Sequence, residues 1–154
     1  MKNLIVMVGI PCSGKSTIVS EINKNLGYDV LSYDNIREEY CKRNGIYYED
    51  SFNIERICKI ITKLYHLERE ELVSRGADII LDNTNIDSKA RWSLDVLFPD
   101  YKKKAIFFDT PLEVCLERNK LRKWKYIPED IIKNFNVRKE EPSYHEGYVE
   151  ILKV

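Results

Sequence analysis

One short segment constrains the fold more than any other part of this chain. Residues Gly9 to Ser16 read GIPCSGKS and match the pattern G-x-x-x-x-G-K-[S/T] in full. The compact apolar segment Leu4 to Val8 precedes the match, and apolar residues at helical spacing follow it as far as Leu26. A strand, a glycine-rich turn and a helix in this order form a phosphate-binding loop, because backbone N–H groups and the helix N-terminus then point at phosphate oxygens. The segment therefore predicts a nucleotide site.

The residues of this segment have separate expected roles at the nucleotide. Lys15 places a positive charge near the β- and γ-phosphates, and the Ser16 hydroxyl is the expected protein ligand of Mg²⁺, which prefers oxygen ligands and retains several waters. Thr17 is either a further phosphate contact or an ordinary residue at the helix start. The sequence thus predicts bound ATP and Mg²⁺, with nucleotide-binding residues Gly9, Pro11, Cys12, Ser13, Gly14, Lys15, Ser16 and Thr17.

Short apolar segments alternate with helical patterns along the rest of the chain. Strands are expected at residues 4–8, 28–33, 79–81, 105–109 and 148–154, and helices at residues 16–26, 52–75, 89–97 and 111–118, with another from residue 128. A further helical element begins at Asp34 or Asn35, and residues 41–51 are expected to be irregular. The alternation predicts one α/β domain over residues 1–154 with a mostly parallel sheet, whose ligands bind beyond the carboxyl ends of the strands.

Composition and charge narrow the class of protein without identifying a partner. The chain has 154 residues, of which 44% are hydrophobic, and this excludes wholesale disorder and allows a core without metal or disulfides. Its 25 basic and 25 acidic residues exclude a polybasic arm as a general attractor of nucleic acid. The four cysteines form no C-x-x-C pair and are expected to be reduced, and no apolar run is long enough to cross a bilayer. We therefore expect a cytoplasmic protein without membrane contact, whose number of subunits the sequence leaves open.

The expected chemistry is phosphoryl transfer to a hydroxyl group. The chain has no sequence typical of guanine selection by switch GTPases, and it is too short to carry the accessory parts of large motor ATPases. Asp34 follows the second strand and is the expected general base opposite the phosphate loop; the alternative is that Asp34 only caps its helix. Arg37 lies one turn further on the same side, where it neutralises an acceptor phosphate or steers the carboxylate, or is merely exposed.

Two further segments are expected to complete the site. Asp82 closes the third strand, where it holds Mg²⁺ through water or orients the acceptor; the alternative is that it caps the turn into the next helix. Residues Arg118 to Lys125 are rich in basic side chains and predict a lid whose arginines reach the transferring phosphoryl group. Arg118 and Arg122 are four residues apart and share a helix face; the alternative is a solvated helix end.

Taken in order, these segments resemble the P-loop 5′-hydroxyl polynucleotide kinases. The similar segments are GIPCSGKST at 9–17, YDNIR at 33–37, Thr84-Asn85, Phe108-Asp109, Arg118-Asn119 and Ile127-Pro128. The resemblance implies a P-loop NTPase fold of the adenylate-kinase-like type, a three-layer sandwich with a basic lid. It also implies transfer of the γ-phosphoryl group of ATP to the 5′-OH end of DNA or RNA. By this resemblance Lys15 and Ser16 serve ATP and Mg²⁺, Asp34 is the general base, Arg37 contacts the acceptor phosphate, and Arg118 and Arg122 are lid residues.

The chain departs from this family's pattern at one position. The family has an acidic residue directly before the Thr-Asn pair, and here Asn83 stands between Asp82 and Thr84. We favour Asp82 for the acidic role, because strand-end carboxylates are common in P-loop folds. No D-x-D-x-T motif is present, so kinase activity without phosphatase activity is expected. Two alternatives stay open: a kinase of the same fold acting on a small metabolite or an aminoacyl-tRNA, and an adaptor that binds ATP without transferring its phosphate.

Overall fold

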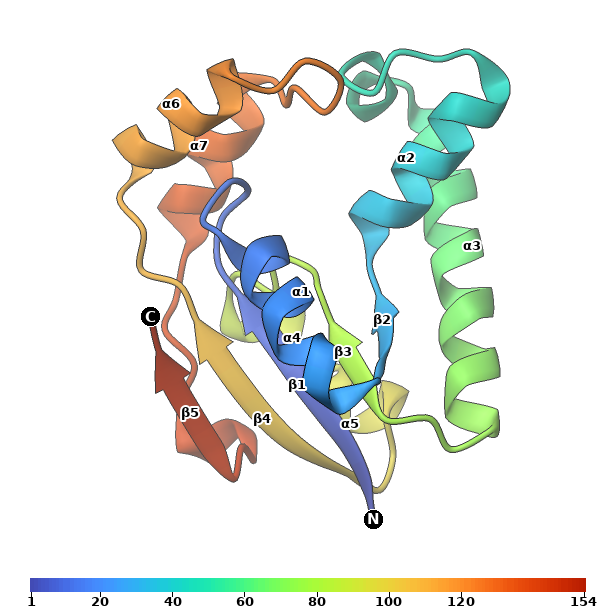
Figure 1. The fold of residues 1–154 in the computed structure, drawn as a ribbon, viewed down its shortest axis with the longest axis vertical. Coiled ribbons are helices and arrows are strands. Elements are labelled where there is room, and N and C mark those ends of the chain that lie inside the picture. The colour runs from blue at the N-terminus through green and yellow to red at the C-terminus, as the bar shows by residue number, and fades with distance from the viewer.

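Five parallel strands form the centre of the molecule (Figure 1). The computed structural model describes residues 1–154, and the strands lie in the order β2-β3-β1-β4-β5 across the sheet. Each neighbouring pair of strands is parallel. The strands are β1 (Lys2–Val8), β2 (Asp29–Leu31), β3 (Ile79–Leu81), β4 (Tyr101–Phe107) and β5 (Glu150–Lys153). This sheet confirms the predicted α/β fold.

Helices connect the strands. They are α1 (Lys15–Leu26), α2 (Tyr33–Asn44), α3 (Glu55–Ser74), α4 (Ser88–Trp92), α5 (Leu94–Leu97), α6 (Leu112–Lys120) and α7 (Glu129–Arg138). Two short 3₁₀ turns, η1 (Asp50–Asn53) and η2 (Tyr144–Glu146), complete the elements. None of the helices combines the length and the apolar character needed to cross a membrane.

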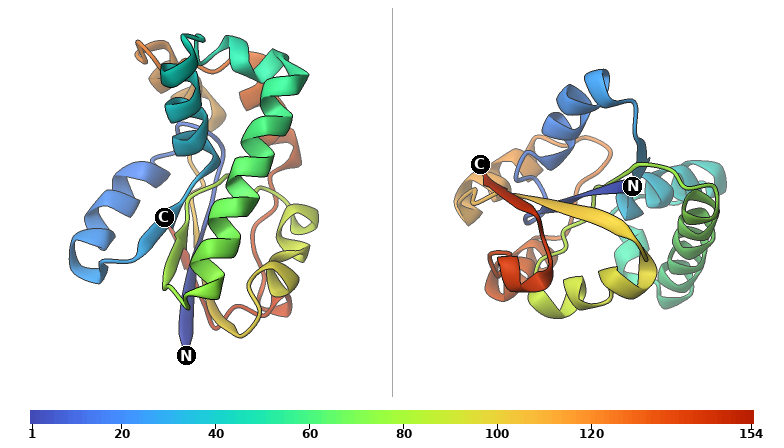
Figure 2. Two further views of the ribbon diagram at one scale, coloured as in Figure 1. Left: turned by 90° about the vertical axis from the view of Figure 1, so that its right-hand side faces the viewer. Right: turned by 90° about the horizontal axis from the view of Figure 1, so that it is seen from below.

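The helices cover both faces of the sheet (Figure 2). Leu4 and Val6 of β1 belong to the same buried apolar cluster as Leu72 of α3. Met7, the next residue of β1, belongs instead to a cluster that contains Val19 of α1. Alternate side chains of a strand point to opposite faces, so β1 is buried on both sides, which explains why its sequence is an apolar run without polar alternation. The molecule is the predicted three-layer sandwich.

Several predicted element boundaries are wrong. The helix expected from Asp34 or Asn35 begins one residue earlier, because Ser32 is its N-cap, and it continues to Asn44 through residues expected to be irregular. α3 begins at Glu55, since the residues before it form the η1 turn. β4 begins at Tyr101, four residues before the predicted start, because its lysines pair with β1. The helix expected over 89–97 is divided into α4 and α5 at Ser93.

The order of the strands places a crevice at the carboxyl end of β1. From β1 the chain crosses to β2 on one side, and from the adjacent β3 it crosses to β4 on the other side, so the connections that leave β1 and β3 run in opposite directions. In open α/β sheets, ligands bind outside the carboxyl ends of the strands at such a switch point. The segment GIPCSGKS follows β1 directly and therefore lies in this crevice.

Two parts of the chain flank the crevice (Figure 1). On one side are α2 and the segment up to η1, residues 33–53, which we call the α2–η1 arm. On the other side are α6 and α7, joined by residues 121–128, which we call the lid loop. The Lys125 amine of the lid loop lies 3.0 Å from a carboxylate oxygen of Glu38 on α2. The two sides are therefore in contact with each other.

Candidate active site

The phosphate loop has a backbone that depends on glycine. A Cβ atom at Gly9 would lie 2.7 Å from Ser13 Oγ and 2.9 Å from Phe108 Cβ, so no other residue fits there without displacing its neighbours. Gly14 has a φ of 103° and is the N-cap of α1, and no side chain caps this helix end. The first N–H groups of α1 are consequently free of side-chain acceptors and available to an anion.

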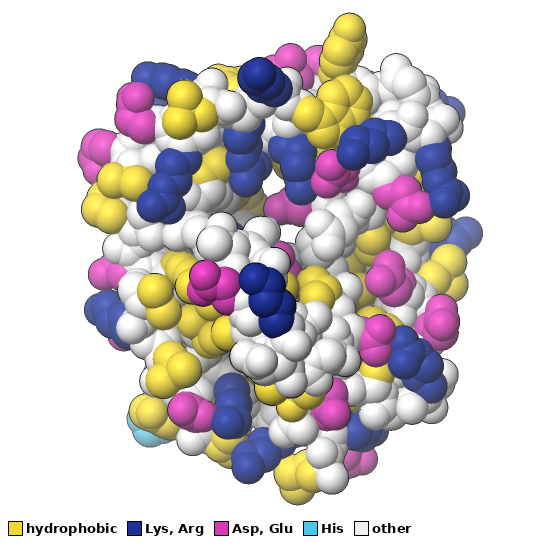
Figure 3. All heavy atoms as spheres, viewed as in Figure 1, with side chains coloured by type: hydrophobic (Ala, Val, Ile, Leu, Met, Phe, Trp, Pro, Cys, Tyr) yellow, Lys and Arg dark blue, Asp and Glu magenta, His cyan; other side chains and the backbone are white.

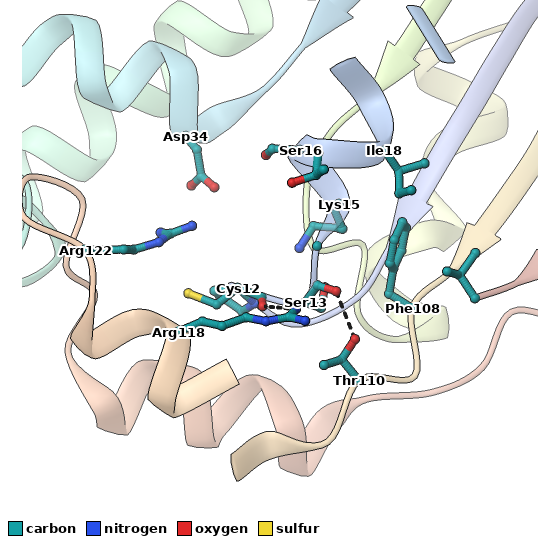
Figure 4. A pocket seen from close by; sticks show the side chains of 14 residues that line it. Cys12, Ser13, Lys15, Ser16, Ile18, Asp34, Phe108, Thr110, Arg118 and Arg122 are labelled. Atoms are coloured by element: carbon teal, nitrogen blue, oxygen red, sulfur yellow. Dashed lines mark hydrogen bonds between the residues drawn. The ribbon is translucent and has the colours of Figure 1, made fainter. Parts of the chain in front are cut away.

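A cavity of about 500 Å³ opens beside the loop (Figure 4). Figure 3 shows the surface hollowed between the α2–η1 arm and the lid loop, with basic and acidic side chains at the rim. Every predicted nucleotide-binding residue except Gly9 lines the cavity, and so does Asp34. The lining residues are Pro11, Cys12, Ser13, Gly14, Lys15, Ser16, Thr17, Ile18, Asp34, Phe108, Thr110, Arg118, Arg122 and Val154.

Lys15 is buried at the centre of the loop. Its amine donates to the carbonyl oxygens of Gly9 and Ile10, both at 2.9 Å. Burial lowers the pKa of Lys15, and the charges of Asp34 and Asp82 act in the opposite direction. A buried amine that contacts only carbonyls is a site where an incoming phosphate oxygen gains a strong charge-assisted contact.

Ser16 and Asp82 form a pair of oxygen donors next to the loop. The Ser16 hydroxyl donates to Asp82 Oδ2 at 3.1 Å, and Asp82 is 7% exposed. Burial raises the pKa of Asp82, and the charge of Lys15 opposes this. Asp82 does not line the main cavity; it lines an adjoining cavity of about 450 Å³ that also includes Ser16.

The neighbour of Asp82 points elsewhere. Asn83 Oδ1 accepts the backbone N–H of Tyr33 at 2.9 Å, and its amide donates to the Tyr65 hydroxyl at 3.0 Å. Of the two residues before the Thr-Asn pair, Asp82 is thus the one beside Ser16. The capping alternative for Asp82 is wrong, because the N-cap of α4 is Asp87, whose carboxylate accepts the backbone N–H of Ala90.

Asp34 faces the loop from the first turn of α2 (Figure 4). The capping alternative is wrong here too, because the Ser32 side chain accepts the backbone N–H of Asn35 and Ser32 is the N-cap. Asp34 Oδ1 accepts a hydrogen bond of 3.2 Å from the Tyr48 hydroxyl. An exposed carboxylate in the cavity wall is free to accept a proton from a bound hydroxyl.

Arg37 contacts its own arm rather than the main cavity. Its guanidinium donates to Ser51 Oγ at 3.0 Å and lies 4.2 Å above the ring of Phe52. It does not line the cavity beside the loop. Arg37 therefore fastens η1 to α2, and an arginine has further N–H groups with which to meet an acceptor.

The two lid arginines both line the cavity. Arg118 of α6 donates to the carbonyl oxygen of Cys12 at 3.1 Å, and Arg122 donates to that of Lys125 at 3.2 Å. The expectation that they share one helix face is wrong, because α6 ends at Lys120 and Arg122 belongs to the lid loop. Both guanidinium groups nevertheless face the phosphate loop (Figure 4).

The chain is similar to known P-loop proteins over most of its length. The family model described as an AAA domain (AAA_33) matches residues 4–142. A shikimate kinase of Clostridium botulinum is 33% identical over 147 residues, which span 91% of this chain and 77% of that protein. The chain belongs to this P-loop kinase family. Phosphotransferase chemistry with ATP and Mg²⁺ is what membership implies.

Other relatives of this P-loop kinase carry different substrate names. A protein of the Autographa californica nuclear polyhedrosis virus, named as a bifunctional polynucleotide kinase/RNA ligase, is 29% identical over 149 residues, which span 87% of this chain and 20% of that protein. A solved Pnkp1/Rnl/Hen1 RNA repair complex superimposes with a TM-score of 0.66 at 22% identity, over 89% of this chain and 43% of that chain. The structural match shows the shared fold alone.

Sequence reasoning missed part of the kinase cavity. Ile18, Phe108, Thr110 and Val154 line it although none was predicted to bind the nucleotide. Thr110 has a visible role, because its hydroxyl donates to the Ser13 carbonyl oxygen at 2.9 Å and so supports the loop. Their positions after predicted strands could have identified three of them, because ligands bind beyond the carboxyl ends of parallel strands. Phe108 and Thr110 follow β4, and Val154 follows β5.

Proposed function

We propose that this P-loop kinase transfers the γ-phosphoryl group of ATP to the 5′-OH end of DNA or RNA, within one domain formed by residues 1–154. The observation that carries the proposal is a single cavity in which Asp34 faces Lys15 and Ser16. Arg118 and Arg122 line the same cavity. A base, a phosphate cradle and positive charge near the transferring group are the parts that phosphoryl transfer requires. The polynucleotide acceptor is supported by the YDNIR segment, by its order relative to Thr84-Asn85, and by the viral relative.

The loop fits a triphosphate and a magnesium ion. Ser13 Oγ is buried without a hydrogen-bond partner, and no side chain caps the start of α1 beside it. Ser16 and Asp82 offer a hydroxyl and a carboxylate, which are hard oxygen donors of the type that Mg²⁺ takes, either directly or through water. When bound, Mg²⁺ supplies positive charge that offsets the charge of the triphosphate.

The reacting groups divide between the two sides of the cavity. Asp34 takes the proton of the acceptor hydroxyl as the new oxygen–phosphorus bond forms, and the bond from the γ-phosphorus to the bridging oxygen breaks to release ADP. Lys15, Arg118 and Arg122 offset the negative charge that develops on the transferring group. Arg37 is one helical turn beyond Asp34 and meets the phosphate next to the 5′-terminal nucleoside.

A second candidate is a kinase for shikimate. The relative named shikimate kinase has the higher identity, 33% against 29% for the viral protein. A small alcohol with a carboxylate would present an anion beside its hydroxyl, as a nucleotide end does, and would use the same base. The two candidates differ in the size and charge of the acceptor.

Direct competition between the two acceptors tests the proposal. We expect label from γ-labelled ATP to pass to 5′-OH oligonucleotides and not to shikimate. The Michaelis constant for the oligonucleotide should rise with salt, because phosphate contacts are lost to screening. The Lys15→Ala variant should lose transfer, and Lys59→Ala, which changes an exposed lysine on α3 away from both cavities, should retain it. Transfer to shikimate alone would replace the first candidate by the second, and no transfer to either would overturn both.

A further inference from the structure

A buried phenol contacts the proposed base and has no part in the reaction described above. The side chain of Tyr48 is in the α2–η1 arm, and the residue is 1% exposed. Its hydroxyl donates to Asp34 Oδ1 at 3.2 Å, across fourteen positions of sequence. Asp34 itself is exposed in the cavity wall, so this contact is the one that limits the orientation of its carboxylate.

The ring of Tyr48 is fixed from several directions. It belongs to a buried apolar cluster that includes Ile10 of the phosphate loop and Ile127 of the lid loop. Phe52 meets it edge to face, with ring centroids 5.3 Å apart. Its backbone carbonyl accepts a 2.6 Å hydrogen bond from the Ser51 hydroxyl. The hydroxyl of Tyr48 is therefore held in place by packing that involves both sides of the crevice.

The phenol acts only as a donor toward Asp34. Burial and the nearby charge of Asp34 raise the pKa of Tyr48 well above its usual range, so the hydroxyl keeps its proton at every working pH. A protonated phenol donates one hydrogen bond, and a carboxylate that accepts it on one oxygen keeps the other oxygen free.

We propose that Tyr48 is a positioning residue for the general base: its hydroxyl holds Asp34 Oδ1, so that Oδ2 is presented to the acceptor hydroxyl. This inference rests on the proposed function of Asp34. Small errors in the placement of a reacting group cost about 100-fold in rate, because the productive geometry becomes a rare conformer. The Lys125 amine of the lid loop lies over the ring of Tyr48, 5.8 Å from its centroid, so the base should be aligned best when the lid loop and the α2–η1 arm are in contact.

A double-mutant cycle tests whether Tyr48 acts through Asp34. Tyr48→Phe removes one oxygen atom and keeps the packed ring. We expect kcat to fall about 10- to 100-fold while KM for ATP and for the acceptor stays unchanged, since alignment of the base matters in the transition state. In an Asp34→Asn background the same change should have no further effect, because the oriented carboxylate is already absent. A residue with a purely structural role would lower kcat equally in both backgrounds.

Two controls separate positioning from folding. Tyr101→Phe removes another hydroxyl, which donates to the Ala77 carbonyl oxygen near the amino ends of the strands, away from the cavity. This variant should leave kcat unchanged. Replacement of Tyr48 by 4-aminophenylalanine keeps the ring and an N–H donor, and should restore most of kcat even if the Phe variant is poorly folded. Equal losses in both backgrounds, or no rescue by the amino variant, would overturn the inference. Full activity of the Asp34→Asn single variant would instead overturn the proposed general base. This result does not depend on Tyr48, so the two failures can be distinguished.

Discussion

Asp82 is a carboxylate whose charge opposes folding. It is almost fully buried at the end of β3, and burial raises the pKa of its carboxyl group despite the charge of Lys15. A group with a raised pKa in the folded state stabilises the fold fully below its unfolded pKa of about 3.9, and this contribution is lost as the pH rises through the folded value. Ionisation of Asp82 is therefore unfavourable to the stability of the fold, and the proposed role of its carboxylate at Mg²⁺ gives a reason for an acidic residue at this position.

Neutralising Asp82 should separate stability from activity. We expect Asp82→Asn to raise the melting temperature at pH 7 to 8, and the gain should shrink toward zero near pH 4. Transfer activity should fall about 10- to 100-fold, as it does when groups that orient a metal's ligands are removed. Thermal denaturation across this pH range and steady-state kinetics measure the two effects.

An exposed aspartate provides the matched control for this prediction. Asp100 is exposed in the turn before β4, where an asparagine also tolerates the positive φ of 64°. Asp100→Asn should show no increase in melting temperature that grows with pH. A lower melting temperature of Asp82→Asn at pH 7 would mean that the charge of Asp82 stabilises its surroundings, contrary to the prediction.

Local residues of the site were predictable, and their orientation was not. Lys15 and Ser16 belong to an unbroken motif, so sequence spacing already places them at the loop. The choice between Asp82 and Asn83 depends on which side of the crevice each side chain faces. That direction is set by contacts with Ser16 in one case and with Tyr33 and Tyr65 in the other, far away in the sequence.

Helix α2 carries the proposed base, and its start is fixed by Ser32. Because Ser32 is the cap and Asp34 is not, stability and catalysis should respond to different residues. Ser32→Ala should cost about 1 kcal/mol, as loss of a side-chain cap generally does, which corresponds to a fall of about 2–4 °C in melting temperature for a chain of this size. Asp34→Asn should leave the melting temperature unchanged and lower turnover. A larger loss of stability from Asp34→Asn than from Ser32→Ala would return the capping role to Asp34.

One ion pair joins the lid loop to the α2–η1 arm. Lys125 and Glu38 lie 3.0 Å apart, with side chains 28% and 26% exposed. A partly exposed ion pair contributes up to about 1 kcal/mol to the free energy of unfolding, so Lys125→Gln should leave the melting temperature almost unchanged. Because the pair joins the two sides of the cavity, its loss should favour opening and raise KM for the acceptor about 2- to 5-fold.

The same carboxylate provides a control within one helix. Glu38 also pairs with Lys42, four residues further along α2, at 2.9 Å. Lys42→Gln removes a partner of Glu38 without touching the lid loop and should leave KM unchanged. If both substitutions raise KM equally, the effect belongs to α2 and not to closure of the lid loop.

Element types were predicted better than element ends. The apolar runs of β1 and β3 and the helical spacing in α1 are local signals, and these elements were found. The N–H of Tyr33 at the start of α2 bonds to Asn83, fifty positions away, a contact that the local sequence does not show. Ser32 was therefore placed in the preceding strand, and Asp34 was the only residue considered as a cap. The early start of β4 was missed because Lys102, Lys103 and Lys104 look too polar for a central strand. Lys103 is in fact buried, and its amine donates a hydrogen bond of 2.7 Å to the Glu146 carbonyl oxygen.

At the scale of the whole molecule, one buried arginine joins segments that are distant in sequence. Arg91 of α4 has a side chain 1% exposed and binds both carboxylate oxygens of Glu146, at 2.6 and 3.0 Å. Its Nη1 group also donates to the carbonyl oxygens of Asn85 and Glu140. Asn85 in turn donates to the Met7 carbonyl at 2.8 Å. The network thus runs from the C-terminal part of the chain to the end of β1, directly before the phosphate loop.

Breaking this network from one side should destabilise the whole domain. Glu146→Gln leaves the buried guanidinium of Arg91 without its countercharge, and such a loss costs about 3–5 kcal/mol. Arg138→Gln is the control, because Arg138 pairs with Asp87 at 3.1 Å on the exposed surface and its loss should cost at most about 1 kcal/mol. Urea denaturation measures both. Because the network supports β1 from outside the cavity, Glu146→Gln should retain kcat at a temperature where it is still folded. A small change in stability with a large loss of kcat would mean that Arg91 serves the site rather than the fold.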